Sequence, residues 1–293
     1  MATFTSAANT GSTEMDLISS IVQDELKRAA KLRPTVVDRS DMAMKGIKSI
    51  DLPRFASSFA GPAAQNPDGT TVTPGQTLDF AVDTIDLNDW TSIPYEVPDR
   101  VSTQSMINLE GELAASAGKD YGNYVDDQII AQLRLAADGS GALPDHQIGI
   151  ENNDLQGTGA ALVLEDISKA RRLLNRANVP QDERWMIVPP EMEEDIVNLD
   201  NFRNADKYGS REALLQGEVG QIYGFRVIVH NGLAANEAIA YHKTACAIAV
   251  QQEVRFETRR LSLKLQATEY SFAMGMGQKV LDEGKRQVYL LGA

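Results

Sequence analysis

The chain has 293 residues, with 28 lysines and arginines against 41 aspartates and glutamates, so its formal net charge is -13. Such an acidic protein is a poor candidate for tight binding to phosphate backbones, which requires clustered cations. A single cysteine, Cys246, excludes an intrachain disulfide and lies in an apolar run, so we expect a buried small hydrophobe in a reducing compartment.

Targeting and membrane signals are also missing from the sequence. The first residues show neither the basic nor the apolar region of a signal peptide. No apolar run approaches the roughly 18 residues that span a bilayer. We therefore expect a soluble, cytoplasmic protein that has no membrane partner.

The N-terminal region, residues 1–45, is expected to be an arm that contains one helix. Residues 1–13 are small and polar, which is typical of a loose tail. Apolar residues follow at helical spacing over residues 14–32, and Pro34 ends the pattern. Because the apolar stripe is narrow, we expect this helix to lie on the surface and to be held by neighbouring molecules. Residues 35–50 are expected to continue as an extended connection.

Residues 46–98 form an acidic segment that we expect to be an extended loop built as a β-hairpin. Proline and glycine interrupt its first half, and strong turn signals lie within residues 65–71. Residues 78–87 then alternate between apolar and polar or small, as a half-solvated strand does. A two-stranded arm with so little internal packing needs a neighbour to cover it. The segment therefore predicts a protein that assembles with copies of itself.

A long helix is predicted over residues 101–137, within a segment that spans residues 99–140. Apolar residues recur there at every third or fourth position. A helix of this length measures ~50 Å at ~1.5 Å per residue. Gly111, Gly118 and Gly122 either weaken the helix or permit close packing, and glycines at positions 139 and 141 end the pattern.

The second half of the chain divides into two kinds of pattern. Residues 162–250 are expected to form a compact α/β unit, and residues 254–291 are strand-rich. Helices are predicted at residues 165–178 and 191–199, and strands at residues 185–188, 223–229, 239–241, 245–250, 261–265, 270–274 and 286–291.

The residue types that carry chemistry do not form a recognisable site. The glycines at 217, 220 and 224 match neither a P-loop nor a dinucleotide fingerprint, and turns explain them better. His146, His230 and His242 lie far apart without metal-ligand spacing. The acids at 191, 193, 194 and 195 suit a helix N-terminus, and residues 151–157 match a calcium loop only faintly. We predict no catalytic, cofactor-binding or metal-binding residues, and no enzyme.

The order of these parts resembles the major capsid protein of tailed bacteriophages, whose Hong Kong 97-type fold encapsulins share. Residues 84–104 resemble the return strand of the extended loop running into the spine helix. Residues 184–192 and 220–231 resemble the strand, helix and hairpin of the axial domain, and residues 277–291 resemble the closing strands of the peripheral domain. The resemblance implies an α+β fold with the axial domain at residues 141–250. Residues 251–293 join the spine helix in the peripheral domain.

The resemblance also implies a function and partners. Hexamers and pentamers would tile an icosahedral shell around double-stranded DNA, in a virion assembled in the cytoplasm of the bacterial host. A procapsid would expand as DNA enters, with a separate scaffold protein, a portal and a cement protein as partners. Two alternatives remain open: an encapsulin-type nanocompartment with protein cargo, and an oligomeric α/β enzyme with an unrecognised site.

Two sequence features bear on how such a shell is held together. Residues 46–100 carry eight acidic and three basic side chains, whereas residues 254–293 carry four acidic and seven basic ones, so the two surfaces are complementary. Some relatives join a loop lysine covalently to an asparagine of a neighbour. No lysine lies between Lys48 and Lys119 here, so we expect no such cross-link.

Overall fold

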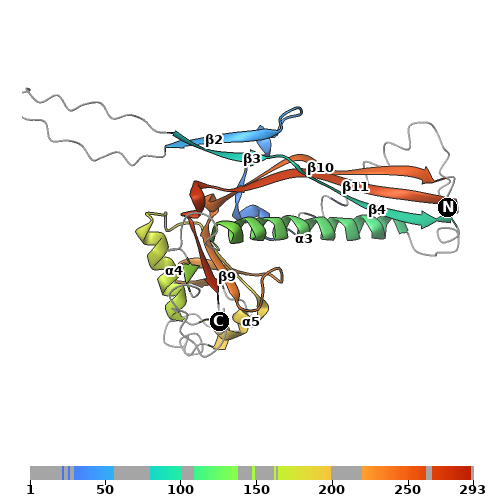
Figure 1. Cartoon of the computed structure of the whole chain (residues 1–293). Helices are drawn as coiled ribbons and strands as arrows, with labels where there is room; N and C mark the ends of the chain where they lie inside the picture. Colours follow the sequence, from blue (N-terminus) through green and yellow to red (C-terminus); the bar gives the residue numbers. More distant parts are fainter. Residues whose placement is uncertain are drawn as a thin grey trace, which may run out of the picture.

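The computed structural model describes residues 22, 26, 30–55, 80–99, 109–137, 147–148, 162, 164–198, 220–261 and 266–291. Three parts make up this portion of the chain. A long four-stranded sheet runs along one helix, a six-stranded sheet forms a smaller block at one end of that helix, and a two-stranded arm projects from the long sheet. Figure 1 shows that the long layer and the smaller block meet at an angle.

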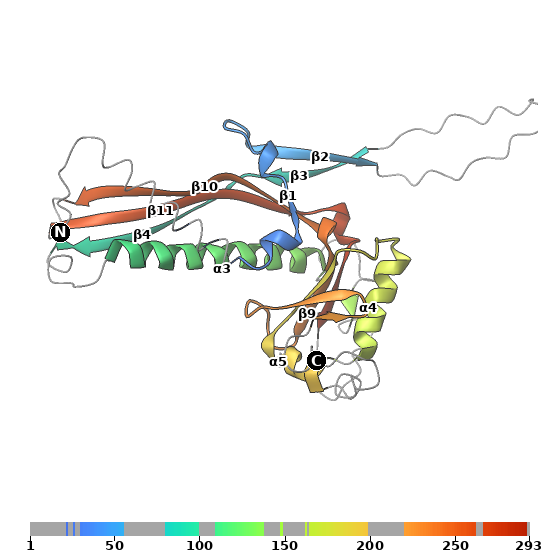
Figure 2. The same ribbon diagram turned by 180° about the vertical axis from the view of Figure 1, so that it is seen from behind.

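The long layer consists of a sheet and the helix α3 (Leu109–Ala137) that packs along it. Its strands lie in the order β1-β10-β11-β4 and are β1 (Val37–Asp38), β4 (Asp89–Pro98), β10 (Cys246–Leu261) and β11 (Ala267–Val280). Figure 2 shows β1 beside β10, with which it pairs in parallel.

The apolar spacing of α3 explains its position on this sheet. The buried residues follow at helical intervals and are Ala114, Ala117, Tyr121, Val125, Ile129, Ile130 and Leu133. The Tyr121 hydroxyl donates to the carbonyl oxygen of Phe272 at 2.6 Å, and the Tyr124 hydroxyl donates to Asp89 Oδ1, also at 2.6 Å. Two tyrosines thus fasten the helix to β11 and to the start of β4. The predicted helix is confirmed from Leu109 onward, and residues 101–108 lie outside the described residues.

The smaller block is an α/β unit with its own core. Its strands lie in the order β5-β12-β9-β6-β8-β7 and are β5 (Gln147–Ile148), β6 (Arg184–Val188), β7 (Gln221–Ile222), β8 (Phe225–Val229), β9 (Glu237–His242) and β12 (Gln287–Leu291). The helices α4 (Leu164–Arg176) and α5 (Pro190–Asn198) cover it, and α5 begins with Glu191 and Glu193 in its first turn, as expected.

A tight hairpin in this block matches the sequence prediction. β7 and β8 are antiparallel neighbours with two residues between them, Tyr223 and Gly224. Both residues have positive φ, at 47° and 87°, which is the backbone pattern of a type I′ turn. The glycine-rich stretch therefore contributes a turn at Gly224, while its first glycine, at 217, lies outside the described residues.

The structure places two of the predicted strands in a different sheet from the one expected. Residues 246–250 were expected in the α/β unit, but they begin β10 of the long sheet, which runs on to Leu261. Residues 287–291 were expected with the peripheral strands, but β12 pairs with β9 in the α/β sheet. Residues 246–250 and 288–290 are buried and apolar or aromatic, and such runs indicate a core strand without showing which sheet contains it.

The region before the arm also differs from its prediction. Val22 and Leu26 are helical and fully buried in the main core, so the helix expected to lie on the surface packs within the molecule at these positions. The predicted extended connection contains two short 3-10 helices, η1 (Arg33–Thr35) and η2 (Ser40–Met42), on either side of β1. Residues 1–21 lie outside the described residues. The apolar stripe predicted from the sequence did not include Val22, which is buried in the structure.

Candidate assembly surfaces

The arm is a two-stranded antiparallel hairpin that has one buried side and one exposed side. β2 (Ser49–Phe55) pairs with β3 (Phe80–Asp86), from Ser49 opposite Asp86 to Phe55 opposite Phe80. Ile50 and Ile85 point into a small buried cluster with Leu87, which rests on the first residues of β10. One side of the arm is therefore fastened to the long sheet, and residues 56–79 of the predicted loop lie outside the described residues.

The other side of the arm displays apolar side chains. Phe80 is 56% exposed and Val82 is 54% exposed, and the two residues lie on the same face because they are two positions apart on β3. Pro53 of β2 lies directly opposite Val82. We call Pro53, Phe80 and Val82 the arm strip. An apolar row on a two-stranded ribbon is stabilised when another surface covers it.

A second apolar surface lies in the loop that precedes the arm. Met42, Met44 and Ile47 are all exposed in this loop. Gln251 of β10 holds the loop in place, because its side-chain nitrogen donates to the carbonyl oxygens of Met44 at 3.0 Å and Ile47 at 2.8 Å. The loop is thus a positioned surface with flexible methionine side chains, which adapt well to a partner.

Charged side chains dominate the far end of the long sheet. Arg255 and Glu257 of β10 form an exposed ion pair at 3.0 Å. Arg260 pairs with Asp99, and hydrogen bonding from its guanidinium holds the pKa of the Asp99 carboxyl below its usual range. Charges on an outer strand discourage unspecific pairing with other sheets. The basic side chains expected between residues 254 and 293 therefore lie partly within ion pairs.

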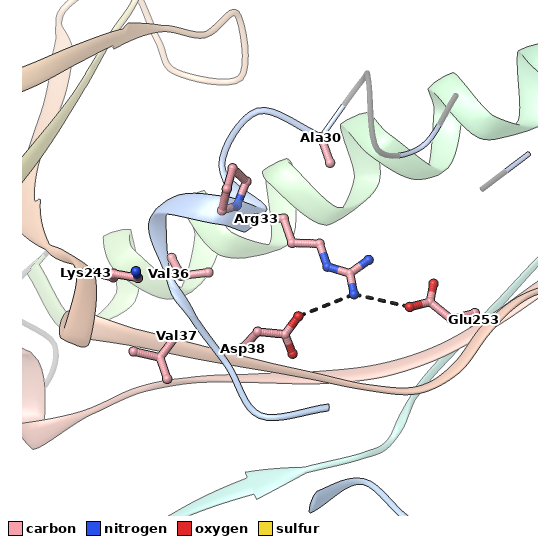
Figure 3. A pocket seen from close by; sticks show the side chains of 8 residues that line it. Ala30, Arg33, Val36, Val37, Asp38, Lys243 and Glu253 are labelled. Carbon is pink, nitrogen blue, oxygen red and sulfur yellow. Dashed lines mark hydrogen bonds and ion pairs between the residues drawn. The ribbon is translucent and has the colours of Figure 1, made fainter. Parts of the chain in front are cut away.

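An open cavity of about 680 Å³ lies between the N-terminal segment and β10, and Figure 3 shows the side chains around it. Arg33 reaches across it, with Nη2 lying 3.4 Å from Asp38 Oδ2 and 3.2 Å from Glu253 Oε1 (Figure 3). Ala30, Pro34, Val36 and Val37 give the cavity an apolar wall. The two carboxylates thus neutralise the guanidinium and hold it in the cavity.

The residues considered as chemical candidates lie in separate places. His230 Nε2 lies 3.4 Å from Asp126 Oδ2, whereas His242 contacts Thr244, and burial lowers the pKa of His242. Burial also raises the pKa of the Cys246 thiol to about 12, as expected for a buried small hydrophobe. His146 and residues 151–157 lie outside the described residues.

Two further absences hold for the described part of the chain. No group of three or more histidine, cysteine, aspartate or glutamate side chains is placed to bind a metal ion there. None of the helices described is both long and apolar enough to cross a membrane.

Two carboxylates that the sequence did not single out, one buried and one half-buried, tie the parts together. Asp126 of α3 accepts hydrogen bonds from the backbone N–H groups of Lys31 at 2.8 Å and Leu32 at 3.0 Å. Glu237 of β9 pairs with Arg134 of α3 at 2.5 Å and accepts a hydrogen bond from the Tyr289 hydroxyl at 2.7 Å. A single acid on a helix or at the start of a strand resembles an ordinary solvated residue, so no local signal predicted these contacts.

Comparison with known proteins gives a consistent picture. The sequence matches the family described as phage capsid protein over residues 18–288. None of the curated proteins matches it significantly.

Several solved structures are similar to this chain. A structure of Mycobacterium phage Che8 has 19% sequence identity and a TM-score of 0.69, with 87% of this chain and 89% of that chain covered. The capsid of cyanophage P-SCSP1u has 17% identity and a TM-score of 0.69, over 88% and 86% of the two chains. A virus-like particle from Pyrococcus furiosus has 12% identity and a TM-score of 0.59, over 94% and 99%. At these identities the likeness establishes the fold.

Proposed function

The chain belongs to the phage capsid protein family and is a major capsid protein with the Hong Kong 97-type fold, and we propose that it forms the hexamers and pentamers of an icosahedral shell. The observation that carries this proposal is the arm. Its inner side is buried on its own subunit, while the arm strip of Pro53, Phe80 and Val82 faces outward. A neighbouring subunit that covers the strip would remove apolar area from water.

Each subunit of a closed shell contacts several neighbours, so several moderate surfaces add together. The arm and the charged pair lie at separate places along the long sheet: the base of the arm rests on Ala247 and Ala249 at the start of β10, whereas Arg255 and Glu257 lie farther along that strand. The acidic character of residues 46–100 and the basic character of residues 254–293 favour one register between neighbours.

The contents of the shell are proposed to be double-stranded DNA, enclosed without sequence-specific binding. A net charge of -13 supports this role, because a strongly basic inner wall would hold the DNA during loading through released counterions. A separate scaffold protein, a portal and a cement protein would act with it, and assembly would take place in the bacterial cytoplasm. We propose residues 46–98 as the extended loop, although β4 pairs with β11 of the long sheet. The axial domain expected at residues 141–250 is changed in two places, because residues 246–250 begin β10 of the long sheet and β12 joins the α/β sheet.

A structural rather than an enzymatic role agrees with the chemistry of the described residues. The cavity described above holds an ion-paired arginine, and the two described histidines contact different partners. The family match also favours a phage shell over the two alternatives, an encapsulin-type nanocompartment and an oligomeric enzyme.

Electron microscopy of the expressed full chain, alone and with a scaffold protein from the same source, tests the proposal. We expect closed icosahedral particles, and particles made during infection should contain nuclease-protected DNA. Particles that enclose protein cargo in place of DNA would indicate a nanocompartment. A small uniform oligomer under all conditions would contradict the shell.

A pair of substitutions tests the arm strip directly. Val82→Asp places a charge on the exposed strip and should abolish assembly while the subunit remains folded, because a charge buried without a partner is strongly disfavoured. Val82→Thr has nearly the same shape and is the matched control that should still assemble. Sedimentation velocity measures assembly, and circular dichroism measures folding. Normal shells from Val82→Asp would show that the strip is not an interface.

A further inference from the structure

One short segment lies where the three parts of the molecule meet. The 3-10 helix η6 (Asp282–Gly284) connects β11 of the long sheet to β12 of the α/β sheet. A second short connection between the two sheets, η5 (Lys243–Ala245), runs from β9 to β10 and lies beside it. The N–H of Leu281 donates to the carbonyl oxygen of Ala245 at 2.8 Å, and the N–H of His242 donates to that of Arg286 at 3.0 Å. The two connections are therefore joined by backbone hydrogen bonds.

The arm reaches this junction through Arg54 and Asp83. Arg54 Nε donates to Asp83 Oδ2 at 3.1 Å, and Arg54 Nη1 donates to Asp282 Oδ1 at 3.0 Å. The backbone N–H of Asp282 donates to the same Asp83 oxygen at 3.0 Å. The three residues thus form a closed ring of hydrogen bonds across the boundary between the arm and the body.

Asp282 also contacts the α/β side of the junction. Its Oδ2 accepts a hydrogen bond from Arg286 Nε at 3.3 Å, and Arg286 Nη1 donates to Thr244 Oγ1 of η5 at 2.7 Å. One carboxylate therefore touches the arm through one oxygen and the inter-sheet connections through the other. Its backbone has a φ of 54°, which is uncommon for a residue other than glycine and persists where the surroundings hold it.

The contacts of Arg54, Asp83 and Asp282 differ from the packing at the base of the arm, because they are directional. The side chains of Arg54, Asp83 and Asp282 are 20%, 14% and 22% exposed, so solvent screens them only partly. The cluster around Ile50, Ile85 and Leu87 holds the arm to β10 by non-directional packing. A guanidinium that bridges two carboxylates is directional, because its donors lie in one rigid plane.

We propose that Arg54, Asp83 and Asp282 form a latch that sets the direction in which the arm leaves the body and ties it to the connection between the two sheets. Asp282 is the positioning residue of this latch. Without its charge the arm keeps its apolar base but samples a range of directions. The proposal concerns the isolated subunit and does not depend on the shell.

Distance measurement by double electron–electron resonance tests the latch on unassembled full-length subunits. Spin labels are attached at Val82→Cys on the arm and Thr258→Cys on β10, both exposed positions. The native Cys246 is fully buried and stays unlabelled. The parent should give one narrow distance distribution. Asp282→Asn, which keeps the shape and tolerates positive φ, and Arg54→Met should both broaden it.

Arg255→Gln is the matched control, because it removes one positive charge from an exposed ion pair on β10 and should leave the distribution narrow. If a latch variant fails to fold, as judged by circular dichroism, the parent is measured instead in about 1 M salt, where the screening length falls to about 3 Å. Broadening in the variants or at high salt, and not in the control, supports the latch. An unchanged narrow distribution under all these conditions overturns it, and neither result bears on shell formation.

Discussion

Asp126 shows how much one side chain contributes to the joint between the N-terminal segment and α3. It is fully buried, and its two oxygens accept the backbone N–H groups of Lys31 and Leu32. These groups follow Ala30, whose own N–H donates to the carbonyl oxygen of Leu26. The carboxylate therefore satisfies two backbone donors at the point where the chain leaves this helical turn.

Asp126→Asn should destabilise the subunit, because an amide has one acceptor oxygen where the carboxylate has two. One backbone N–H then faces an NH₂ donor, at a cost of about 1–3 kcal/mol in the free energy of unfolding. Asp127→Asn, the exposed neighbour on α3, is the control and should stay within about 0.5 kcal/mol. Urea unfolding measures both, and hydrogen exchange should quicken at residues 31 and 32 in the first variant. Equal stability of the two variants would contradict this role.

Glu237 links stability to pH. Burial opposes its ionisation, but the hydrogen bonds from Tyr289 and Ala234 and the charge of Arg134 outweigh that effect, so its pKa lies below the usual 4.5. The unfolded chain therefore binds this proton more tightly than the folded one. The carboxylate stabilises the fold above pH 4.5, and its contribution is lost as the pH falls through the lower folded pKa.

Glu237→Gln should lower the free energy of unfolding at pH 7 by about 1–3 kcal/mol, because charge-assisted hydrogen bonds from Arg134 and Tyr289 are weakened. The difference from the parent should shrink as the pH falls below 4.5. Glu257→Gln, in an exposed ion pair, serves as the control with an effect within about 0.5 kcal/mol. Denaturant unfolding over a pH series tests this, and a constant difference at every pH would be inconsistent with the assignment.

At the scale of elements, close approach of backbones fastens the arm to the long sheet. A Cβ placed on Gly277 of β11 would lie 2.3 Å from the carbonyl oxygen of Asp86 at the end of β3. A Cβ on Gly275 would meet the ring of Trp90 at 3.0 Å. The Gly275-Met-Gly277 pair thus leaves room for β3 and for an indole ring, which is a packing role.

Gly277→Ala should separate β3 from β11, because the obstructing atom belongs to the backbone and cannot rotate away. We expect a loss of about 1–3 kcal/mol in the free energy of unfolding. Gly220→Ala is the matched control: a Cβ there meets nothing within 4 Å, so its effect should be neutral or slightly stabilising. Thermal and urea unfolding of both variants provides the measurement. A Gly277→Ala protein as stable as the Gly220→Ala protein would show that the arm is free to shift.

For the whole molecule, the manner in which subunits are joined can be tested. The described arm carries Arg54 but no lysine, and the sequence has none between Lys48 and Lys119. Arginine stays protonated and is not a substitute for a nucleophilic amine. Shell stability must then come from buried interface area, complementary charge or a cement protein.

Mature particles boiled in detergent and reductant should therefore run as one band near the 32.0 kDa monomer. A single band is expected because only non-covalent contacts join the subunits, and boiling detergent disrupts all such contacts. Untreated particles analysed beside them provide the control for intact shells. A ladder of oligomers that survives the treatment would disprove the prediction.

Local pattern was sufficient to predict several elements. The spacing of Ala117, Tyr121, Val125 and Leu133 predicted the long helix, and the alternation of residues 78–87 predicted β3. These predictions held because an element that buries one face shows the period of its own geometry in the sequence. The order of such elements was also enough to recognise the family, which the match over residues 18–288 confirms.

Only the tertiary structure decided which sheet each strand joins and which partner each charged side chain contacts. Residues 246–250 are an apolar run and residues 288–291 are apolar or aromatic, so nothing local showed that the first begins β10 and the second belongs to β12, which pairs with β9. The contacts of Glu237 with Tyr289 and of Asp282 with Arg54 join residues 52 and 228 positions apart. Local propensity carries no information over such separations, because the partner of a charge is chosen only when the chain folds back on itself.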